Sequence, residues 1–290
     1  MEKLLAGLIL IAIILITVNF FEKKSFSSRH KLPYQETYKF MGKTMSYKVL
    51  GKGQSVILLH GSMHTPPWND FDEKLAKDFQ VYVLDLPGFG ASDAINGKIH
   101  NTDLFSKALC EFIKLKNLNG APIISLSLGT VVSAKAAIKG CTTGVLIFVG
   151  APSKVTGAKA RILQMIPLSL KRMLIATYWA KDKLLIPTLY ENIGNKLKPD
   201  NSKFIQDLET TDVRSIVDIN YLKEINQEFP QVVKQLKNKI VYIYGENDAQ
   251  KNQVNYLTKD FIEIKNSRHN IFVDQPEKLI ETIKSLALVV

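Results

Sequence analysis

Strand-like and helix-like patterns alternate along residues 55 to 150 of this chain. Residues 55–59 form a continuous apolar run of the kind found in strands buried on both faces, and residues 80–84 and 144–149 also read as strands. Helical patterns occupy residues 68–79 and 101–118 between them. Such alternation predicts a mostly parallel sheet with helices on both faces. The 290-residue length allows one large α/β domain with an insertion.

The alternation stops after residue 150 and resumes near residue 239. The intervening stretch shows several helical patterns, no convincing strand and five prolines: Pro152, Pro167, Pro187, Pro199 and Pro230. A helical cap inserted above the sheet fits this pattern best. We therefore expect a core made of residues 34–150 and 231–290, with the cap at 151–230. An antiparallel hairpin should open the core at residues 34–50.

An uncharged segment at residues 4–21 precedes the core. As a helix it would be about 27 Å long, close to the roughly 30 Å hydrocarbon thickness of a bilayer. A cleaved signal peptide is the alternative, but no small-x-small cleavage site follows the apolar run. We predict an uncleaved single-pass membrane anchor at residues 1–22 and a basic linker at 23–33. The more basic C-terminal flank favours a cytoplasmic core domain, with export as the alternative.

The formal net charge of +11 permits contact with nucleic acids or anionic lipids. Much of the excess positive charge lies beside the apolar segment. Residues 22–52 contain two acidic residues, Glu22 and Glu36, and eight basic ones: Lys23, Lys24, Arg29, Lys31, Lys39, Lys43, Lys48 and Lys52. This position favours lipid headgroups over DNA, so we expect a membrane partner and no nucleic acid. A merely solvated basic face is the alternative.

Cysteine and histidine spacing indicates neither a disulfide framework nor a metal site. Cys110 and Cys141 are the two cysteines, far apart and without a Cys-x-x-Cys pattern. His60 and His64 are four residues apart, but they bracket a glycine-containing loop instead of lying on a helix. We therefore expect no metal and no cofactor.

A sharp strand-to-helix turn is predicted at Ser127. Ile123 and Ile124 belong to a short apolar run, and residues 131–138 favour a helix. A serine on such a turn projects its Oγ out of the sheet, and the N–H groups that open the helix can stabilise an oxyanion. Gly129 provides the small residue that lets strand and helix pass closely, whereas Ser125 replaces the first glycine of a G-x-S-x-G pattern. An ordinary polar turn is the alternative.

Other motifs follow the predicted strands in a set order. They are His60-Gly61-Ser62-Met63, the loop from Asp85 to Asp93, Gly245-Glu246-Asn247-Asp248, and Ser267-Arg268-His269. Together with Ser127, these motifs make residues 34 to 290 resemble the α/β-hydrolase family. The resemblance implies the α/β-hydrolase fold, with a sheet of about eight strands and the cap lying over the C-terminal strand ends.

The resemblance also implies a catalytic triad. Ser127 would be the nucleophile and His269 its general base, because a serine hydroxyl needs a base beside it at neutral pH. Asp248 would orient the imidazole, with Glu246 as the alternative acid. Oxyanion donors are expected from the backbone N–H of Leu128 and from one N–H of Ser62 or Met63.

We expect a membrane-tethered serine hydrolase that cleaves a small, lipophilic carboxylic ester, similar to an esterase or lipase. Apolar residues of the cap suit an apolar acyl group. Candidate pocket residues are His64, Trp68, Met165, Met173 and Trp179. A catalytically silent binding protein of the same fold, an acyltransferase and a carbon–carbon bond hydrolase remain open alternatives, and the oligomeric state is not predicted.

Overall fold

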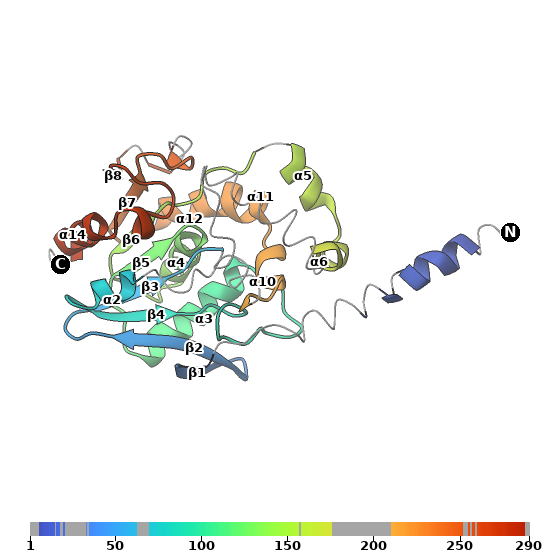
Figure 1. Cartoon of the computed structure of the whole chain (residues 1–290), viewed down its shortest axis with the longest axis horizontal. Helices are drawn as coiled ribbons and strands as arrows, with labels where there is room; N and C mark the ends of the chain where they lie inside the picture. Colours follow the sequence, from blue (N-terminus) through green and yellow to red (C-terminus); the bar gives the residue numbers. More distant parts are fainter. Residues whose placement is uncertain are drawn as a thin grey trace.

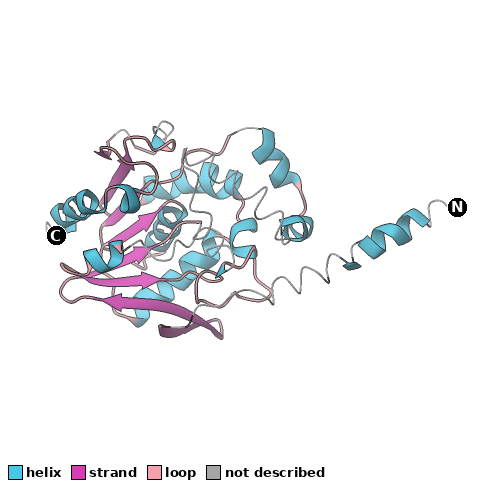
Figure 2. Cartoon of the chain, in the orientation of Figure 1, coloured by secondary structure: helices cyan, strands magenta, loops and turns pink. Residues whose placement is uncertain are grey.

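The structure is a computed structural model of the chain (Figure 1). It describes residues 6–14, 16–17, 20, 33, 35–62, 70–156, 158–175, 210–251, 255, 257–258 and 260–287. One twisted sheet runs through the centre of the molecule, with helices in front of it and behind it (Figures 1 and 2).

The described strands form one eight-stranded sheet in the order β1-β2-β4-β3-β5-β6-β7-β8. The strands are β1 (Glu36–Phe40), β2 (Lys43–Leu50), β3 (Ser55–Leu59), β4 (Gln80–Leu84), β5 (Ile123–Leu126), β6 (Leu146–Val149), β7 (Ile240–Gly245) and β8 (Ile262–Ile264). β2 pairs antiparallel with β1 and with β4, and every other pairing is parallel. The prediction of a mostly parallel eight-stranded sheet is confirmed.

Two hydrophobic layers cover the two faces of the sheet, as the alternation of side chains along a strand requires. Ile57 and Leu59 of β3 face a cluster that includes α3 (Thr102–Leu115) and α4 (Leu128–Ile138). Val56 and Leu58 face the opposite cluster, which includes α2 (Phe71–Leu75), α13 (Ile271–Asp274) and α14 (Pro276–Ala287). The central strands are therefore buried on both faces, as their continuous apolar sequences predict.

The described elements between β6 and β7 are helical. They are α5 (Ala158–Met165), α6 (Leu168–Ile175), α10 (Arg214–Val217), α11 (Tyr221–Lys223), the π-helix η2 (Glu224–Glu228) and α12 (Phe229–Gln235). The expected helical character of this stretch agrees with these elements, but the exact bounds of a cap domain stay a prediction.

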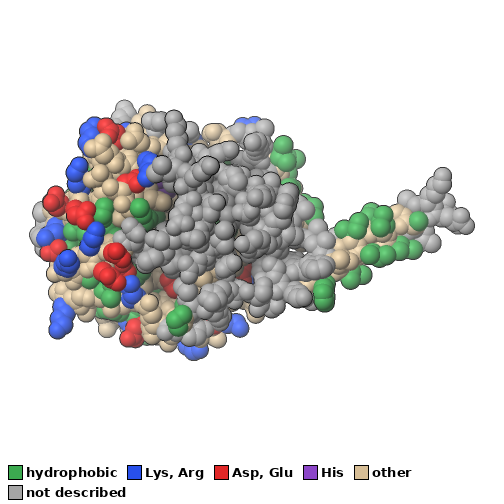
Figure 3. Space-filling view, viewed as in Figure 1, with side chains coloured by type: hydrophobic (Ala, Val, Ile, Leu, Met, Phe, Trp, Pro, Cys, Tyr) green, Lys and Arg blue, Asp and Glu red, His purple; other side chains and the backbone are tan. Residues whose placement is uncertain are grey.

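The N-terminal prediction requires a correction. Residues 6–14 are helical and carry exposed apolar side chains such as Leu8 and Ile11 (Figure 3). Within the described residues, no helix combines the length and apolarity needed to cross a membrane. The predicted membrane localisation is therefore wrong, and the described residues give no support to the single-pass anchor predicted at residues 1–22.

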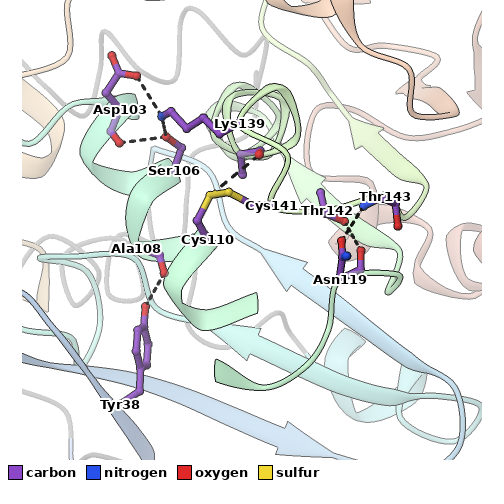
Figure 4. Close-up of a disulfide and its surroundings, with 11 residues drawn as sticks. Tyr38, Asp103, Ser106, Ala108, Cys110, Asn119, Lys139, Cys141, Thr142 and Thr143 are labelled. Atoms are coloured by element: carbon purple, nitrogen blue, oxygen red, sulfur yellow. Dashed lines mark hydrogen bonds and ion pairs between the residues drawn. A yellow bond between two sulfur atoms is a disulfide. The ribbon is translucent and has the colours of Figure 1, made fainter. Parts of the chain in front are cut away.

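A disulfide between Cys110 and Cys141 joins α3 to the end of α4 (Figure 4). The two Cα atoms are 5.2 Å apart, although 31 positions separate the residues in sequence. The same two helices are also joined by the Lys139 ammonium, which lies 3.3 Å from Asp103 Oδ1. The spacing of the two cysteines in the sequence did not indicate the disulfide, because only the packing of α3 against α4 brings them together.

Reduction of this disulfide is expected to destabilise the domain. Loop-closure entropy for a separation of this size corresponds to about 3–4 kcal/mol of unfolding free energy. Urea unfolding of the purified protein should therefore show a lower midpoint in excess dithiothreitol, and the Cys110→Ala, Cys141→Ala double variant should match the reduced protein. A midpoint that does not move on reduction would contradict a stabilising role.

Candidate active site

Ser127 lies at the sharp turn between β5 and α4. Its backbone has φ 49° and ψ −118°, an unusual conformation for a residue with a side chain. The turn is fixed by neighbouring hydrogen bonds: the Ser127 N–H donates to Val149 O at 3.0 Å, and the Thr130 hydroxyl donates to Ser127 O at 2.7 Å. A Cβ on Gly129 would stand only 2.5 Å from His60 O. The chain therefore holds Ser127 in a strained conformation that requires glycine two residues later.

Ser125, which departs from the glycine pattern, is buried without loss of hydrogen bonding. Its hydroxyl lies 3.0 Å from the Ser133 hydroxyl in α4, and Ser133 also donates to Thr130 O at 3.1 Å. A buried hydroxyl costs little when its hydrogen bonds are formed. Serine in place of glycine at residue 125 thus adds a side-chain hydrogen bond between β5 and α4 and does not disturb the turn.

His269 and Asp248 form a buried pair. His269 Nδ1 lies 3.0 Å from Asp248 Oδ2, and the two residues are 3% and 1% exposed. The Gln250 N–H donates to the other carboxylate oxygen of Asp248 at 2.9 Å. This arrangement holds the imidazole with Nδ1 toward the carboxylate and leaves Nε2 as the nitrogen directed away from it.

Glu246, the alternative acid, points elsewhere. Its carboxylate accepts the Asn266 N–H at 2.9 Å and pairs with Lys265 at 3.2 Å. These two contacts hold the pKa of Glu246 below its ordinary value. Glu246 thus belongs to a surface cluster, whereas Asp248 contacts the histidine.

Gly150 lies between the histidine pair and the residue that binds the Ser127 N–H. It follows Val149, whose carbonyl receives the Ser127 N–H, and it has φ +57°. A Cβ at this position would stand 2.9 Å from Nδ1 and Cε1 of His269 and 3.3 Å from Asp248 Oδ2. The serine and the imidazole therefore border the same end of β6. The sequence signal for this residue is a glycine directly after a predicted strand.

The loop after β3 also contacts Ser127. A Cβ on Gly61 would stand 3.1 Å from Ser127 Cβ. His60 Nε2 accepts the Leu86 N–H at 3.1 Å, so the proton is on Nδ1, which donates to Gly61 O at 2.8 Å. His60 is buried and orients the peptide that joins Gly61 to Ser62.

The structure describes some of the remaining predicted site residues and leaves others outside the described part of the chain. Leu128 opens α4 and is 2% exposed, and Ser62 is the last described residue of its loop. Met165 ends α5 with 83% of its surface exposed, and Met173 lies in α6. The other candidates lie outside the described residues: Met63, His64, Trp68 and Trp179.

A sequence model of the alpha/beta hydrolase family matches residues 56–282, which is most of the chain. The chain belongs to the α/β-hydrolase family. The match spans β3 through α14 and so includes the Ser127 turn, Asp248 and His269.

A characterised relative of this α/β hydrolase is similar over a limited stretch. A pimeloyl-[acyl-carrier protein] methyl ester esterase of Shewanella woodyi is 33% identical over 104 residues. The aligned stretch covers 34% of this chain and 36% of the relative. This chain thus matches about a third of the relative's length.

Solved structures resemble this α/β hydrolase over almost its whole length. An alpha/beta hydrolase fold protein from Burkholderia ambifaria has a TM-score of 0.67 at 16% identity, covering 89% of this chain and 99% of that protein. A thermophilic esterase from Thermogutta terrifontis has a TM-score of 0.68 at 18% identity, covering 86% and 95%. At such low identity these similarities establish the fold alone.

The glycine beside the histidine pair provides a test of this geometry. Gly150→Ala is expected to lower kcat for an ester by about 100-fold, because displacing a reacting group by about 1 Å has a cost of that order. Gly97→Ala is the matched control, since Gly97 also has positive φ but nothing lies within 4 Å of its added Cβ. Steady-state kinetics of both purified variants make the comparison. Equal kcat values in the two variants would show that Gly150 does not position the pair.

Proposed function

We propose that this α/β hydrolase is a serine hydrolase that cleaves a carboxylic ester through an acyl-enzyme on Ser127. The proposal is carried by one observation: the strained Ser127 turn is bonded to Val149, and the buried Asp248–His269 pair lies against the next residue, Gly150. A hydroxyl placed beside an oriented imidazole is the arrangement that nucleophilic catalysis requires.

In this mechanism His269 Nε2 takes the proton of Ser127 as Oγ attacks the ester carbonyl. Asp248 holds the opposite ring nitrogen and stabilises the imidazolium that forms. The Leu128 N–H and the N–H of Ser62 or Met63 stabilise the oxyanion. The imidazolium then donates its proton to the leaving alcohol. A water molecule, deprotonated by the same imidazole, attacks the acyl-enzyme; the bond to Ser127 Oγ breaks, Oγ takes the proton back from the imidazolium, and the acid is released.

One comparison favours an ester as the substrate over other carbonyl compounds. The relative from Shewanella woodyi is named as a methyl ester esterase. The apolar residues that recur within 165–186 suit an apolar acyl chain. We therefore propose a small ester with an apolar acyl group.

Turnover of a short p-nitrophenyl ester by the purified chain tests this proposal. Ser127→Ala protein prepared in parallel sets the background. Release of nitrophenolate well above that background supports an ester hydrolase, whereas equal rates in the two preparations would refute the proposal.

A further inference from the structure

Tyr221 links α11 to the loop that contacts Ser127. It is the first residue of α11, and its hydroxyl is hydrogen-bonded to the side chain of Ser62. Ser62 directly follows Gly61, which lies against Ser127. A side chain from the helical segment between β6 and β7 thus reaches the loop expected to supply an oxyanion donor.

Two buried carboxylates fix the backbone on either side of Tyr221. Asp218 accepts the His100 N–H at 2.8 Å, and Glu224 accepts the Thr102 N–H at 2.9 Å. Both carboxylates are about as buried as core residues, at 5% and 4% exposure. Because both bonds reach the start of α3, the segment carrying Tyr221 is held firmly against the core domain.

The Tyr221 phenol stays protonated at neutral pH. Burial raises the pKa of Tyr221 to about 12, and the nearby Glu224 carboxylate acts in the same direction. The contact with Ser62 is therefore a bond between two neutral hydroxyls. Such a bond is directional and adds no charge to the site.

Ser62 is consequently held at two points. The His60 ring binds Gly61 O at 2.8 Å, and in a trans peptide the N–H of the next residue points the opposite way. The hydroxyl of Ser62 is held by Tyr221. The His60 contact sets the plane of the Gly61–Ser62 peptide. The Tyr221 contact restricts rotation of Ser62, the residue that carries the N–H.

We propose that Tyr221 is a positioning residue of the oxyanion hole, which acts through the Ser62 side chain to aim the Ser62 N–H at the developing oxyanion. This inference rests on the proposed serine hydrolase function. An oxyanion donor contributes through its placement before reaction, so loss of the Tyr221 hydroxyl should weaken transition-state binding and leave substrate binding largely unchanged.

Tyr221→Phe tests the inference by removing a single hydroxyl. We expect kcat for a p-nitrophenyl ester to fall about tenfold with KM within about twofold, a change confined to the transition state. Affinity for a trifluoromethyl ketone, whose adduct with serine carries an oxyanion, should fall by the same factor. Ser62→Ala should reproduce both changes, and the double variant should be no worse than either single variant.

Tyr242→Phe is the matched control. Tyr242 is a tyrosine whose pKa burial likewise raises to about 12, but its hydroxyl has no hydrogen-bond partner within the described part of the chain. Its kinetics and inhibitor affinity should equal those of the wild type.

The outcomes separate this inference from the proposed function. If the wild type turns over no ester, the proposed function fails. If the wild type is active but Tyr221→Phe retains its kcat and inhibitor affinity, only the Tyr221 inference is overturned. Additive losses in the double variant would also overturn it, because independent effects exclude a shared bond. Since Ser62→Ala breaks the same bond from the other side, poor folding of Tyr221→Phe leaves the test intact.

Discussion

Replacing Ser127 with alanine is expected to lower kcat for a p-nitrophenyl ester by roughly 10⁴- to 10⁶-fold, because the attacking hydroxyl is removed from the triad. Substrate binding should persist, since the serine adds little to ground-state affinity. Steady-state kinetics at saturating ester provide the measurement. Circular dichroism should show an unchanged fold, because the turn depends on backbone hydrogen bonds to Val149 and Thr130.

A double-variant experiment checks that Ser127 and His269 act together. His269→Ala should be nearly as damaging as Ser127→Ala, and the double variant should be little worse than either, because triad members act as one unit. Full activity in Ser127→Ala protein would rule out the mechanism. Multiplied losses in the double variant would show that the two residues work independently.

Replacing Asp248 with asparagine is the second change with a large expected effect. An amide in this position would favour the wrong imidazole tautomer and could not compensate the imidazolium, so kcat should fall by about 10³- to 10⁴-fold. Glu246→Gln is the matched control: it neutralises a carboxylate of the same turn that contacts Lys265 and Asn266. Its kcat should stay within about twofold of the wild type, as expected for a surface contact.

The acid assignment depends on the contrast between these two variants. A more damaging Glu246→Gln would make Glu246 the acid and Asp248 a residue of the turn. Comparison of KM values adds a further check, because Asp248→Asn should leave substrate binding near its wild-type value.

The core of the fold was predictable because its signals are local. The apolar run at 55–59 became β3 with the same bounds, and the pattern at 80–84 became β4. Strands buried on both faces need continuous apolar residues, so their positions can be predicted from the sequence. Register and strand order depend on long-range pairing and were not predicted; the family resemblance supplied only the expectation of about eight strands.

The candidate site was predictable at the residues that end strands. Asp248 and His269 were chosen from their motifs, and the structure places them 3.0 Å apart. The contributions of Gly150 and Tyr221 were not predicted, because each follows from a tertiary approach between distant segments. The same reason explains why the pairing of Cys110 with Cys141 was missed.

The membrane localisation was predicted from the length and apolarity of residues 4–21, from the missing cleavage site and from the basic flank. An uncharged run is compatible with several structures, so these local signals did not determine where the protein resides.

Labelling with a fluorophosphonate probe tests the central claim most directly. The probe phosphonylates a serine only where a base activates the hydroxyl and an oxyanion site accepts the adduct. Digestion and mass spectrometry of the labelled protein should find one adduct on the peptide containing Ser127, absent from Ser127→Ala and strongly reduced in His269→Ala. An unlabelled Ser127 in folded wild-type protein, or an adduct on another residue, would contradict the account.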